Sequence, residues 1–263
     1  MSPSRSWAEI EDLTRAPMVR LSVNVNKVAT LRNSRGGHEP RVLDAVDVCL
    51  AAGVRGITVH TRADQRHITP TDVREIARRL AGVRPSVEFN MEGDPRQEFI
   101  DLVHEVQPEQ CTIVPVVPGE ITSQAGWTQG PDTDRLPGVI GAMRSQGIRV
   151  SLFVDPTVEA IKLASQVGAD RVELYTEPFA RAFERGPAAA EASFAVYADI
   201  ARQAHARGLG VNAGHDLDLA NLVLFRTLPN LDEVSIGHAI MSRALFVGLE
   251  TVVREYLALL DPV

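Results

Sequence analysis

Short β-branched segments of this chain end in polar residues that can move protons. Four of the seven histidines lie at or just after such ends, namely His60, His67, His215 and His238. Two glutamates, Glu92 and Glu173, hold comparable positions. Histidine titrates near neutral pH, and burial raises the pKa of a carboxyl group. The set is therefore suited to acid–base chemistry on carbonyl compounds.

Several of these residues also have simpler interpretations. Glu173 can be a buried carboxylate that pairs with an arginine or orients another group, whereas Glu92, among apolar neighbours, is the better candidate for a general base. Asp155 is interpreted as a helix N-cap rather than as a catalyst. His104 and His205 lie within predicted helices and receive no role.

Two parts of the sequence predict binding of phosphate. Gly237 and His238 open the last predicted helix, whose free backbone N–H groups can bind an anion, and Asn212–His215 follows the seventh predicted strand. Arginines near other strand ends provide forked donors. These are Arg32, Arg35, Arg62 and Arg66. Two separate anion sites around one His/Glu cluster indicate two phosphorylated substrates.

The elements that must position these residues alternate between short apolar segments and longer segments of helical period, which is typical of parallel strands with crossover helices. No GxGxxG turn follows the first segment, which disfavours a dinucleotide fold. We predict one (β/α)8 TIM barrel over residues 1–263, with residues 1–19 as an N-terminal helical extension. The predicted strands are Arg20–Asn24, Gly56–His60, Ser86–Asn90, Gln110–Val114, Arg149–Val154, Arg171–Leu174, Gly210–Asn212 and Glu233–Ile236.

Proline and glycine mark the predicted helix boundaries. Three dipeptides are interpreted as an N-cap followed by proline: Thr69-Pro70, Asp94-Pro95 and Asp155-Pro156. Three connections are longer than a barrel needs and are interpreted as site or lid loops. They are Lys27–Pro40, Pro115–Asp134 and Thr176–Pro187.

Composition narrows the class of protein. The net charge is -7, with no basic block and few aromatic residues, so nucleic acid is not an expected partner. No apolar segment of 18 residues predicts a membrane span, and the N-terminus lacks the apolar core of a secretory signal. The two cysteines, Cys49 and Cys111, suggest buried thiols rather than a disulfide framework, which favours the cytoplasm.

Eight distinctive sequence segments follow one another along the chain: NVNKVATLRNSRGG, GITVHTRADQRHIT, NMEG, VPGEITSQAGW, VSLFVDP, VELYT, VNAGHDLDLANL and SIGHAIMSRALFVGL. In order and spacing they resemble the pyridoxine 5'-phosphate synthase family. The resemblance implies a (β/α)8 barrel with extra helices, a homo-octamer, and no metal or redox cofactor. It implies the condensation of 1-deoxy-D-xylulose 5-phosphate with 3-amino-1-hydroxyacetone 1-phosphate to pyridoxine 5'-phosphate, phosphate and water.

The resemblance also implies roles for individual residues. His60 and Glu92 match the general bases of the family, His215 its general acid, and Glu173 a carboxylate that stabilises the transition state. Positions that match the binding site for deoxyxylulose phosphate are Asn26, Lys27, Arg62, His67 and Thr122. Positions that match the binding site for the amino-ketone phosphate are Asn24, Arg35, Asp216, Gly237 and His238.

This chain departs from the family pattern at two places. Many members have aspartate and histidine where this chain has Asn26 and Lys27, which leaves binding possible but removes proton transfer there. Glycine is common where this chain has Asp216. A carboxylate near a phosphate is unfavourable, so contact there is expected from the backbone N–H.

Three other functions stay open on the sequence. Lys27 at a strand end could form a Schiff base in an aldolase, although a phosphate-binding cation is favoured because arginines lie nearby. The histidines and glutamates could instead bind a metal in a hydrolase, but they lack HExxH spacing. A phosphate-binding barrel without catalysis is the third possibility.

Overall fold

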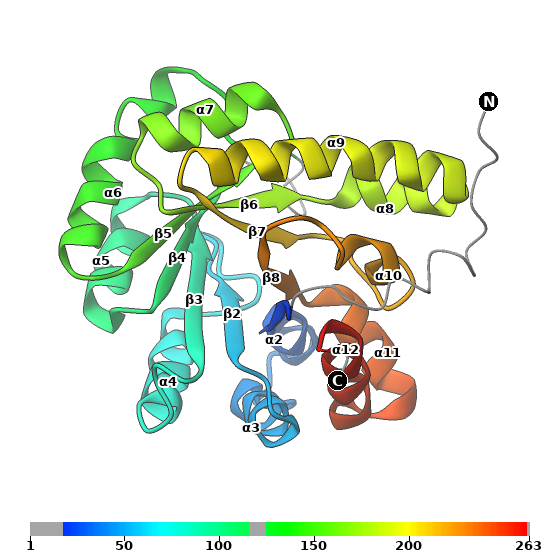
Figure 1. Cartoon of the computed structure of the whole chain (residues 1–263). Coiled ribbons are helices and arrows are strands. Elements are labelled where there is room, and N and C mark those ends of the chain that lie inside the picture. Colours follow the sequence, from blue (N-terminus) through cyan, green and yellow to red (C-terminus); the bar gives the residue numbers. More distant parts are fainter. Residues whose placement is uncertain (1–17, 116–124, 262–263) are drawn as a thin grey trace.

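Eight parallel strands close into a barrel in which each strand pairs with the next along the chain and β8 pairs with β1. The computed structural model describes residues 18–115 and 125–261, and Figure 1 shows the barrel with helices around it. The predicted barrel fold is confirmed. The strands are β1 (Arg20–Asn24), β2 (Gly56–His60), β3 (Glu88–Gly93), β4 (Gln110–Ile113), β5 (Arg149–Val154), β6 (Arg171–Tyr175), β7 (Gly210–Gly214) and β8 (Leu231–Ile236).

Helices cover the outside of the barrel, and some connections carry two of them, as the predicted extra helices require. Their apolar faces pack on the outward side chains of the strands to form the main core. None of the described helices is long and apolar enough to cross a membrane. The helices are α2 (Asn26–Asn33), α3 (Val42–Ala52), α4 (Pro70–Leu80), α5 (Gln97–Val106), α6 (Leu136–Ser145), α7 (Val158–Gln166), α8 (Glu177–Glu184), α9 (Pro187–Ala206), α10 (Leu222–Phe225), α11 (His238–Val247) and α12 (Leu249–Leu260), with a 3₁₀ turn at Pro131–Thr133.

Four strands, β3, β6, β7 and β8, extend beyond their predicted bounds, and two of these extensions affect the predicted site. β3 starts later and continues to Gly93, so Glu92 lies within the strand and pairs in register with His60 of β2. β7 continues past the predicted end at Asn212 to Gly214, so Ala213 and Gly214 are strand residues and not part of a phosphate loop. Both predictions treated polar residues as strand ends, but the interior of this barrel is itself polar, and a polar side chain there does not end a strand.

The predicted helix starts are only partly right. Thr69 caps α4 in a reciprocal capping box with Asp72, as expected from its proline neighbour. The N-caps of α5 and α7 are Arg96 and Thr157, so Asp94 and Asp155 do not cap those helices. Proline follows each of these aspartates, but each N-cap lies two residues further along the chain. In α7 the hydroxyl oxygen of Thr157 caps the helix by accepting the backbone N–H of Ala160.

Two predicted long loops contain helices. α2 (Asn26–Asn33) takes up the first part of Lys27–Pro40, and α8 lies within Thr176–Pro187. Residues 116–124 of the third loop, Pro115–Asp134, lie outside the described residues. The predicted site residue Thr122 is one of them. Residues 1–17 of the predicted N-terminal extension lie outside the described residues as well.

An ion pair fixes α2, which carries the predicted binding residues Asn26 and Lys27. Arg32 of α2 donates two hydrogen bonds, of 2.5 and 2.9 Å, to the buried carboxylate of Asp72 at the start of α4. The sequence suggested Arg32 as a hydrogen-bond donor to a bound anion, but its ion pair with Asp72 gives it a structural role instead. The same carboxylate accepts hydrogen bonds from the backbone N–H and hydroxyl of Thr69.

Asp72→Ala is expected to destabilise the protein by about 3 kcal/mol, because it removes a capping box and leaves a partly buried guanidinium without its carboxylate. Urea denaturation measures this change. Asp64→Asn is the matched control, since its pair with Arg66 is at the surface and its loss should change the free energy of unfolding by under ~0.5 kcal/mol. Equal effects of the two substitutions would contradict the structural role of Arg32.

The inside of the barrel holds polar side chains in layers. A layer at the floor, where the strands begin, consists of charged and amide groups that contact one another; it is called the floor layer below. Its members are Arg20, Glu88, Gln110, Arg149, Arg171, Asn212 and Glu233. Above it lie small polar groups, among them Ser22, Thr58, Asn90 and Thr112.

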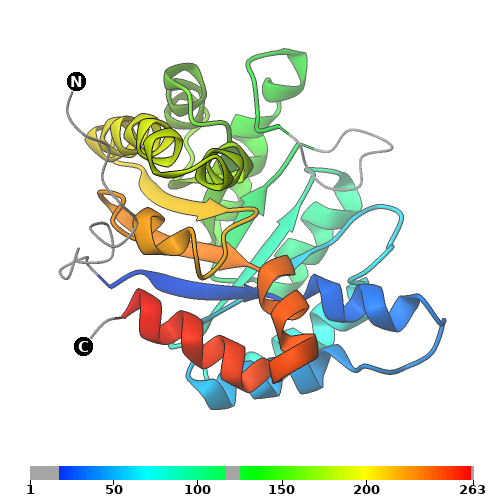
Figure 2. The same cartoon turned by 90° about the vertical axis from the view of Figure 1, so that its right-hand side faces the viewer.

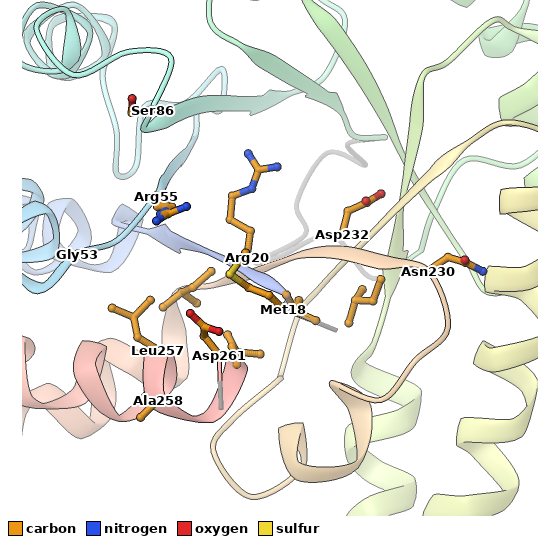
Figure 3. A pocket seen from close by; sticks show the side chains of 14 residues that line it. Met18, Arg20, Gly53, Arg55, Ser86, Asn230, Asp232, Leu257, Ala258 and Asp261 are labelled. Atoms are coloured by element: carbon orange, nitrogen blue, oxygen red, sulfur yellow. The ribbon is translucent and has the colours of Figure 1, made fainter. Parts of the chain in front are cut away.

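A pocket of about 890 Å³ opens at the floor, below this layer. Figure 3 shows Met18 and Arg20 from the start of β1, Asp232 from β8, and residues from the end of α12 around it. No predicted site residue lines this pocket. The predicted chemistry lies at the opposite end of the barrel.

Candidate active site

The carboxyl ends of the strands surround a pocket of about 260 Å³. In Figure 2 this end lies where β1 runs into α2. The pocket brings together twelve of the fourteen predicted site residues, from seven positions along the chain. They are Asn24, Asn26, Lys27, His60, Arg62, His67, Glu92, Glu173, His215, Asp216, Gly237 and His238.

His60 and Glu92 form the centre of this pocket. Nδ1 of His60 lies 3.7 Å from Oε2 of Glu92, because β2 and β3 place the two residues in register. Nε2 of His60 is buried and has no hydrogen-bond partner among the described residues. Glu92 is 7% exposed. Nδ1 of His60 therefore faces the carboxyl group of Glu92, and Nε2 is available to form a hydrogen bond with a substrate.

Asparagines of the β1–α2 junction hold this centre in place. Nδ2 of Asn24 donates to Oε2 of Glu92 at 3.5 Å, and Oδ1 of Asn24 accepts the backbone N–H of Asn26 at 3.0 Å. Oδ1 of Asn26 in turn accepts the backbone N–H of His60 at 2.9 Å. An amide in place of the family's aspartate thus keeps a positioning contact without a charge.

Two histidines of the pocket, His60 and His67, have lowered pKa values, which favours their neutral forms. Burial lowers the pKa of His60 well below its usual value, with the charges of His67 and Arg62 acting in the same direction. Burial, followed by Arg62 and Arg66, lowers the pKa of His67 to about 4. Nδ1 of His67 accepts the backbone N–H of Ile68 at 3.0 Å, so the neutral ring carries its proton on Nε2.

The two carboxyl groups are shifted in the opposite direction. Burial, and then the charge of Glu173, raises the pKa of Glu92 well above its usual value. Burial, and then the charge of Glu233, raises the pKa of Glu173 to about 8. Buried carboxyls with raised pKa values and neutral histidines are the arrangement that proton-transfer sites require.

The ring of His215 packs against two aromatic side chains. Its ring centroid is 5.0 Å from that of Phe153 and 5.3 Å from that of Tyr175. Burial lowers its pKa, and the charge of Asp216 opposes that shift. His215 and Asp216 both have positive φ, at 79° and 58°. Side chains adopt this backbone conformation at a cost, which is typical of residues held in place for function.

Gly214 lets Glu173 reach the pocket. A Cβ at this position would lie 2.5 Å from Oε1 of Glu173. Gly214→Ala is therefore expected to displace that carboxyl group and to lower kcat about 10- to 100-fold, since a misplacement of this size is costly in a site. Steady-state assays test this effect. Gly138→Ala, which has open space in α6, is the control and should keep parental activity.

Anion donors line the other side of the pocket. Gly237 is the N-cap of α11, as predicted, so backbone N–H groups at the start of this helix face the site. A Cβ on Gly237 would lie 2.8 Å from the carbonyl oxygen of Asn24, so the close approach needs glycine. Lys27 is exposed at the start of α2, and Arg62 is 5% exposed.

Two predicted residues are not among those that line the pocket. Arg35 is exposed on the segment after α2, and Thr122 lies outside the described residues. Their assignments stay predictions. Ser235 was missed, although its hydroxyl approaches Oε1 of Glu92 at 3.5 Å. Its position near the end of β8, two residues before Gly237, was the available signal.

The described residues contain no group of three or more His, Cys, Asp or Glu side chains that could hold a metal ion. The carboxyl and imidazole groups of the pocket contact one another and neutral amides instead. The arrangement can therefore accept, hold and donate protons beside a bound anion.

Comparison with known proteins agrees with this chemistry. Residues 21–262 match the family model described as "Pyridoxal phosphate biosynthesis protein PdxJ". A pyridoxine 5'-phosphate synthase of Christiangramia forsetii is 50% identical over 92% of this chain and 100% of its own length. The relative of the same name from Bacteroides fragilis is 51% identical over 91% of this chain and 98% of its own, and that from Leptospira biflexa 46% over 93% and 98%.

Solved structures are similar in fold. The tryptophan synthase α-subunit of Pyrococcus furiosus, at 12% identity, covers 95% of this chain and 100% of its own with a TM-score of 0.59. Phosphoribosylanthranilate isomerase of Thermotoga maritima, also at 12% identity, covers 94% and 100% with a TM-score of 0.58. These likenesses support the barrel alone. The match to the family model and the identity to its curated members confirm the predicted family: this chain belongs to the PdxJ family of pyridoxal phosphate biosynthesis enzymes.

Proposed function

We propose that the protein is a pyridoxine 5'-phosphate synthase. In this role it condenses 1-deoxy-D-xylulose 5-phosphate with 3-amino-1-hydroxyacetone 1-phosphate to pyridoxine 5'-phosphate, phosphate and water. The observation that supports this most is the meeting of His60, Glu92 and His215 in one pocket beside the N-terminus of α11. The reaction needs several proton transfers and two phosphate anchors around one cavity.

His60 is suited to the role of a base in the free site. Its low pKa keeps the ring neutral at neutral pH, and Nε2 is available to take a proton while Nδ1 faces Glu92. Glu92 is a stronger base than an exposed carboxylate when it is ionised, because burial disfavours its charged form. The two residues can therefore remove protons at successive steps.

His215 needs a proton before it can act as an acid. Its pKa is lowered in the free protein. A phosphate dianion bound at the start of α11 brings negative charge to the pocket, and negative charge favours the imidazolium form. Binding of the substrate would thus prepare His215 to protonate leaving water or phosphate.

Glu173 lies at the base of the pocket with its pKa raised to about 8, so it holds its proton at neutral pH. A neutral carboxyl group can donate a hydrogen bond to an oxygen on which charge develops. This supports its proposed role in stabilising the transition state. These groups accomplish the condensation and dehydrations without a net change of oxidation state.

Lys27 is the residue on which an aldolase would depend. Its ammonium group is exposed at the start of α2, next to Arg62 and His67 in the pocket lining, which favours contact with a phosphate. Trapping with borohydride and a ketose phosphate distinguishes the two functions. An adduct on Lys27 would support the aldolase and count against the synthase.

We also propose a cytoplasmic enzyme that assembles from identical subunits, with an octamer as the expected state. Both cysteines, Cys49 and Cys111, are buried free thiols, which fits a reducing compartment. Leu31 of α2 and Leu245 and Phe246 of α11 are 53%, 73% and 88% exposed. The two helices are in contact with each other (Figure 2). Exposed apolar groups of this size are typical of subunit interfaces. Light scattering tests the assembly.

Turnover is the direct test of the function. Purified protein supplied with both phosphorylated substrates is expected to form pyridoxine 5'-phosphate and to release phosphate in equal amounts. The control omits either substrate. No product from folded protein would contradict the synthase and leave the phosphate-binding barrel as the better interpretation.

A further inference from the structure

Glu233 is a buried carboxylate that the proposed reaction does not use. It belongs to the floor layer, below the pocket, and is 2% exposed. Oε1 accepts hydrogen bonds from Nε2 of Gln110 and Nδ2 of Asn212, both at 3.4 Å, and Oε2 lies 3.7 Å from Nε of Arg20. A carboxyl group is rarely buried without a structural or functional reason.

The contacts of Glu233 are those of an ionised carboxylate. Every partner approaches it with an N–H group, and a protonated carboxyl would need an acceptor for its own hydrogen. Burial raises the pKa of Glu233, while the guanidinium groups of Arg20, Arg171 and Arg149 act against that rise. The floor layer therefore supplies the donors and the positive charge that hold a negative charge inside the barrel.

This charge lies close to the active site. Asn212 of β7 pairs in register with both Glu173 of β6 and Glu233 of β8, so one strand separates the two carboxyl groups. The charge of Glu233 is the largest influence after burial that raises the pKa of Glu173, and it also acts on Glu92. Both carboxyl groups are nearly inaccessible to water, so screening between them is weak.

We propose that Glu233 is a positioning residue for the reaction, whose fixed charge at the barrel floor keeps Glu173 protonated beneath the substrates. The inference rests on the proposed function, because it gives Glu173 the part of a hydrogen-bond donor. A neutral Glu173 removes one of the two main causes that raise the pKa of Glu92, the other being burial, so Glu92 ionises more readily and can serve as the base.

The side chains packed around Glu173 determine which other charged groups can affect its protonation. Thr58 of β2 and Gln110 and Thr112 of β4 are interior groups that carry no charge. His60 of β2 is titratable and faces Glu92. Arg20 lines the floor pocket (Figure 3). Its side chain is 27% exposed, while that of Glu233 is 3% exposed. The charged or titratable groups around Glu173 and Glu233 are Arg20, Glu88, Glu92, Arg149, Arg171, His215 and Asp232.

Glu233→Gln tests the inference, because glutamine can still accept the amide hydrogen bonds but carries no charge. Without the charge, Glu173 ionises more readily, so it loses its proton at lower pH. The alkaline limb of the kcat profile is expected to move to lower pH by about half a unit to one unit. Glu233→Asp retains the charge and should restore the parental limb.

Glu88→Gln is the matched control. Glu88 is a carboxylate of the same layer, but it pairs with Arg20 and Arg149 and is not among the groups that act on Glu173. Its loss should leave the limb in place. An unmoved limb in Glu233→Gln, or equal movement in Glu88→Gln, would overturn the proposal.

A measurement without substrate separates this inference from the proposed function. Carbon-13 NMR follows the titration of the Glu173 carboxyl, assigned with Glu173→Gln. If Glu173 titrates at lower pH in Glu233→Gln than in the parent, the electrostatic effect is supported. This result does not depend on turnover, so failure of the parent to form product would contradict only the proposed synthase function. If Glu233→Gln does not fold, Asn212→Asp adds charge to the same layer, and the titration should then move to higher pH; movement to lower pH would overturn the proposal.

Discussion

Glu92→Gln is expected to lower kcat by about 10²- to 10⁴-fold, the usual effect of removing a general base. Glutamine retains the size of the side chain; its amide oxygen can accept the hydrogen bond of Asn24, and its NH2 group can donate to the hydroxyl of Ser235. It cannot take a proton. Because substrate contacts remain, KM should change much less than kcat, and steady-state kinetics with both substrates measure the two separately.

The matched control is Glu98→Gln, the same chemical change at an exposed position in the first turn of α5. It should leave kcat unchanged. Retention of kcat within a few-fold by Glu92→Gln would rule out Glu92 as the base and transfer that role to His60.

The same substitution is expected to stabilise the protein at alkaline pH. The folded state raises the pKa of Glu92, so the native form binds more protons than the unfolded form above the unfolded value. The stability of the parent therefore falls as the pH rises from about 4.5 toward the folded pKa, and Glu92→Gln lacks this loss. Thermal denaturation at pH 5 and pH 8 should show an advantage for the variant that is larger at pH 8.

His215→Gln is expected to have a comparable effect on kcat, about 10²- to 10⁴-fold, because it removes the group that protonates the leaving oxygen. The ring also packs against Phe153 and Tyr175, and glutamine fills that space incompletely. Circular dichroism and thermal denaturation distinguish lost chemistry from lost structure. His205→Gln, on the exposed face of α9, is the control.

The pKa of the His215 ring, measured with and without bound anions, is a second test of its role as the acid. Burial lowers its pKa in the free protein, so proton NMR should show titration of the ring below the usual value of about 6.5. Addition of inorganic phosphate or of the amino-ketone phosphate should raise the titration point. A ring that titrates at the same pH with and without these anions would contradict the role of bound phosphate in preparing the acid.

Much of the site was predictable from the sequence because it depends on local patterns. Short β-branched segments separated by amphipathic helices predict a barrel, and the barrel places distant strand ends on one face. For that reason His60, His215 and Gly237 could be assigned to one site before any contact was known. Membership of the family could be inferred from phrases such as VNAGH and IGHAI.

Contacts between side chains required the tertiary structure. Arg32 and Asp72 are forty positions apart, and only the position of α2 beside the start of α4 makes them an ion pair rather than an anion site. Glu92 was predicted beyond the end of its strand, but its pairing with His60 continues β3 to Gly93.

The polar interior was the largest difference from the sequence-based prediction. The sequence places Arg20, Glu88 and Glu233 in three predicted strands and indicates no role for them. Closure of the barrel brings their side chains together inside, where each charge has a partner. The barrel fold and the candidate acid–base residues could be predicted from the sequence itself. The partners of the charges were decided only by the tertiary structure, because the register and closure of eight strands determine which side chains share the interior.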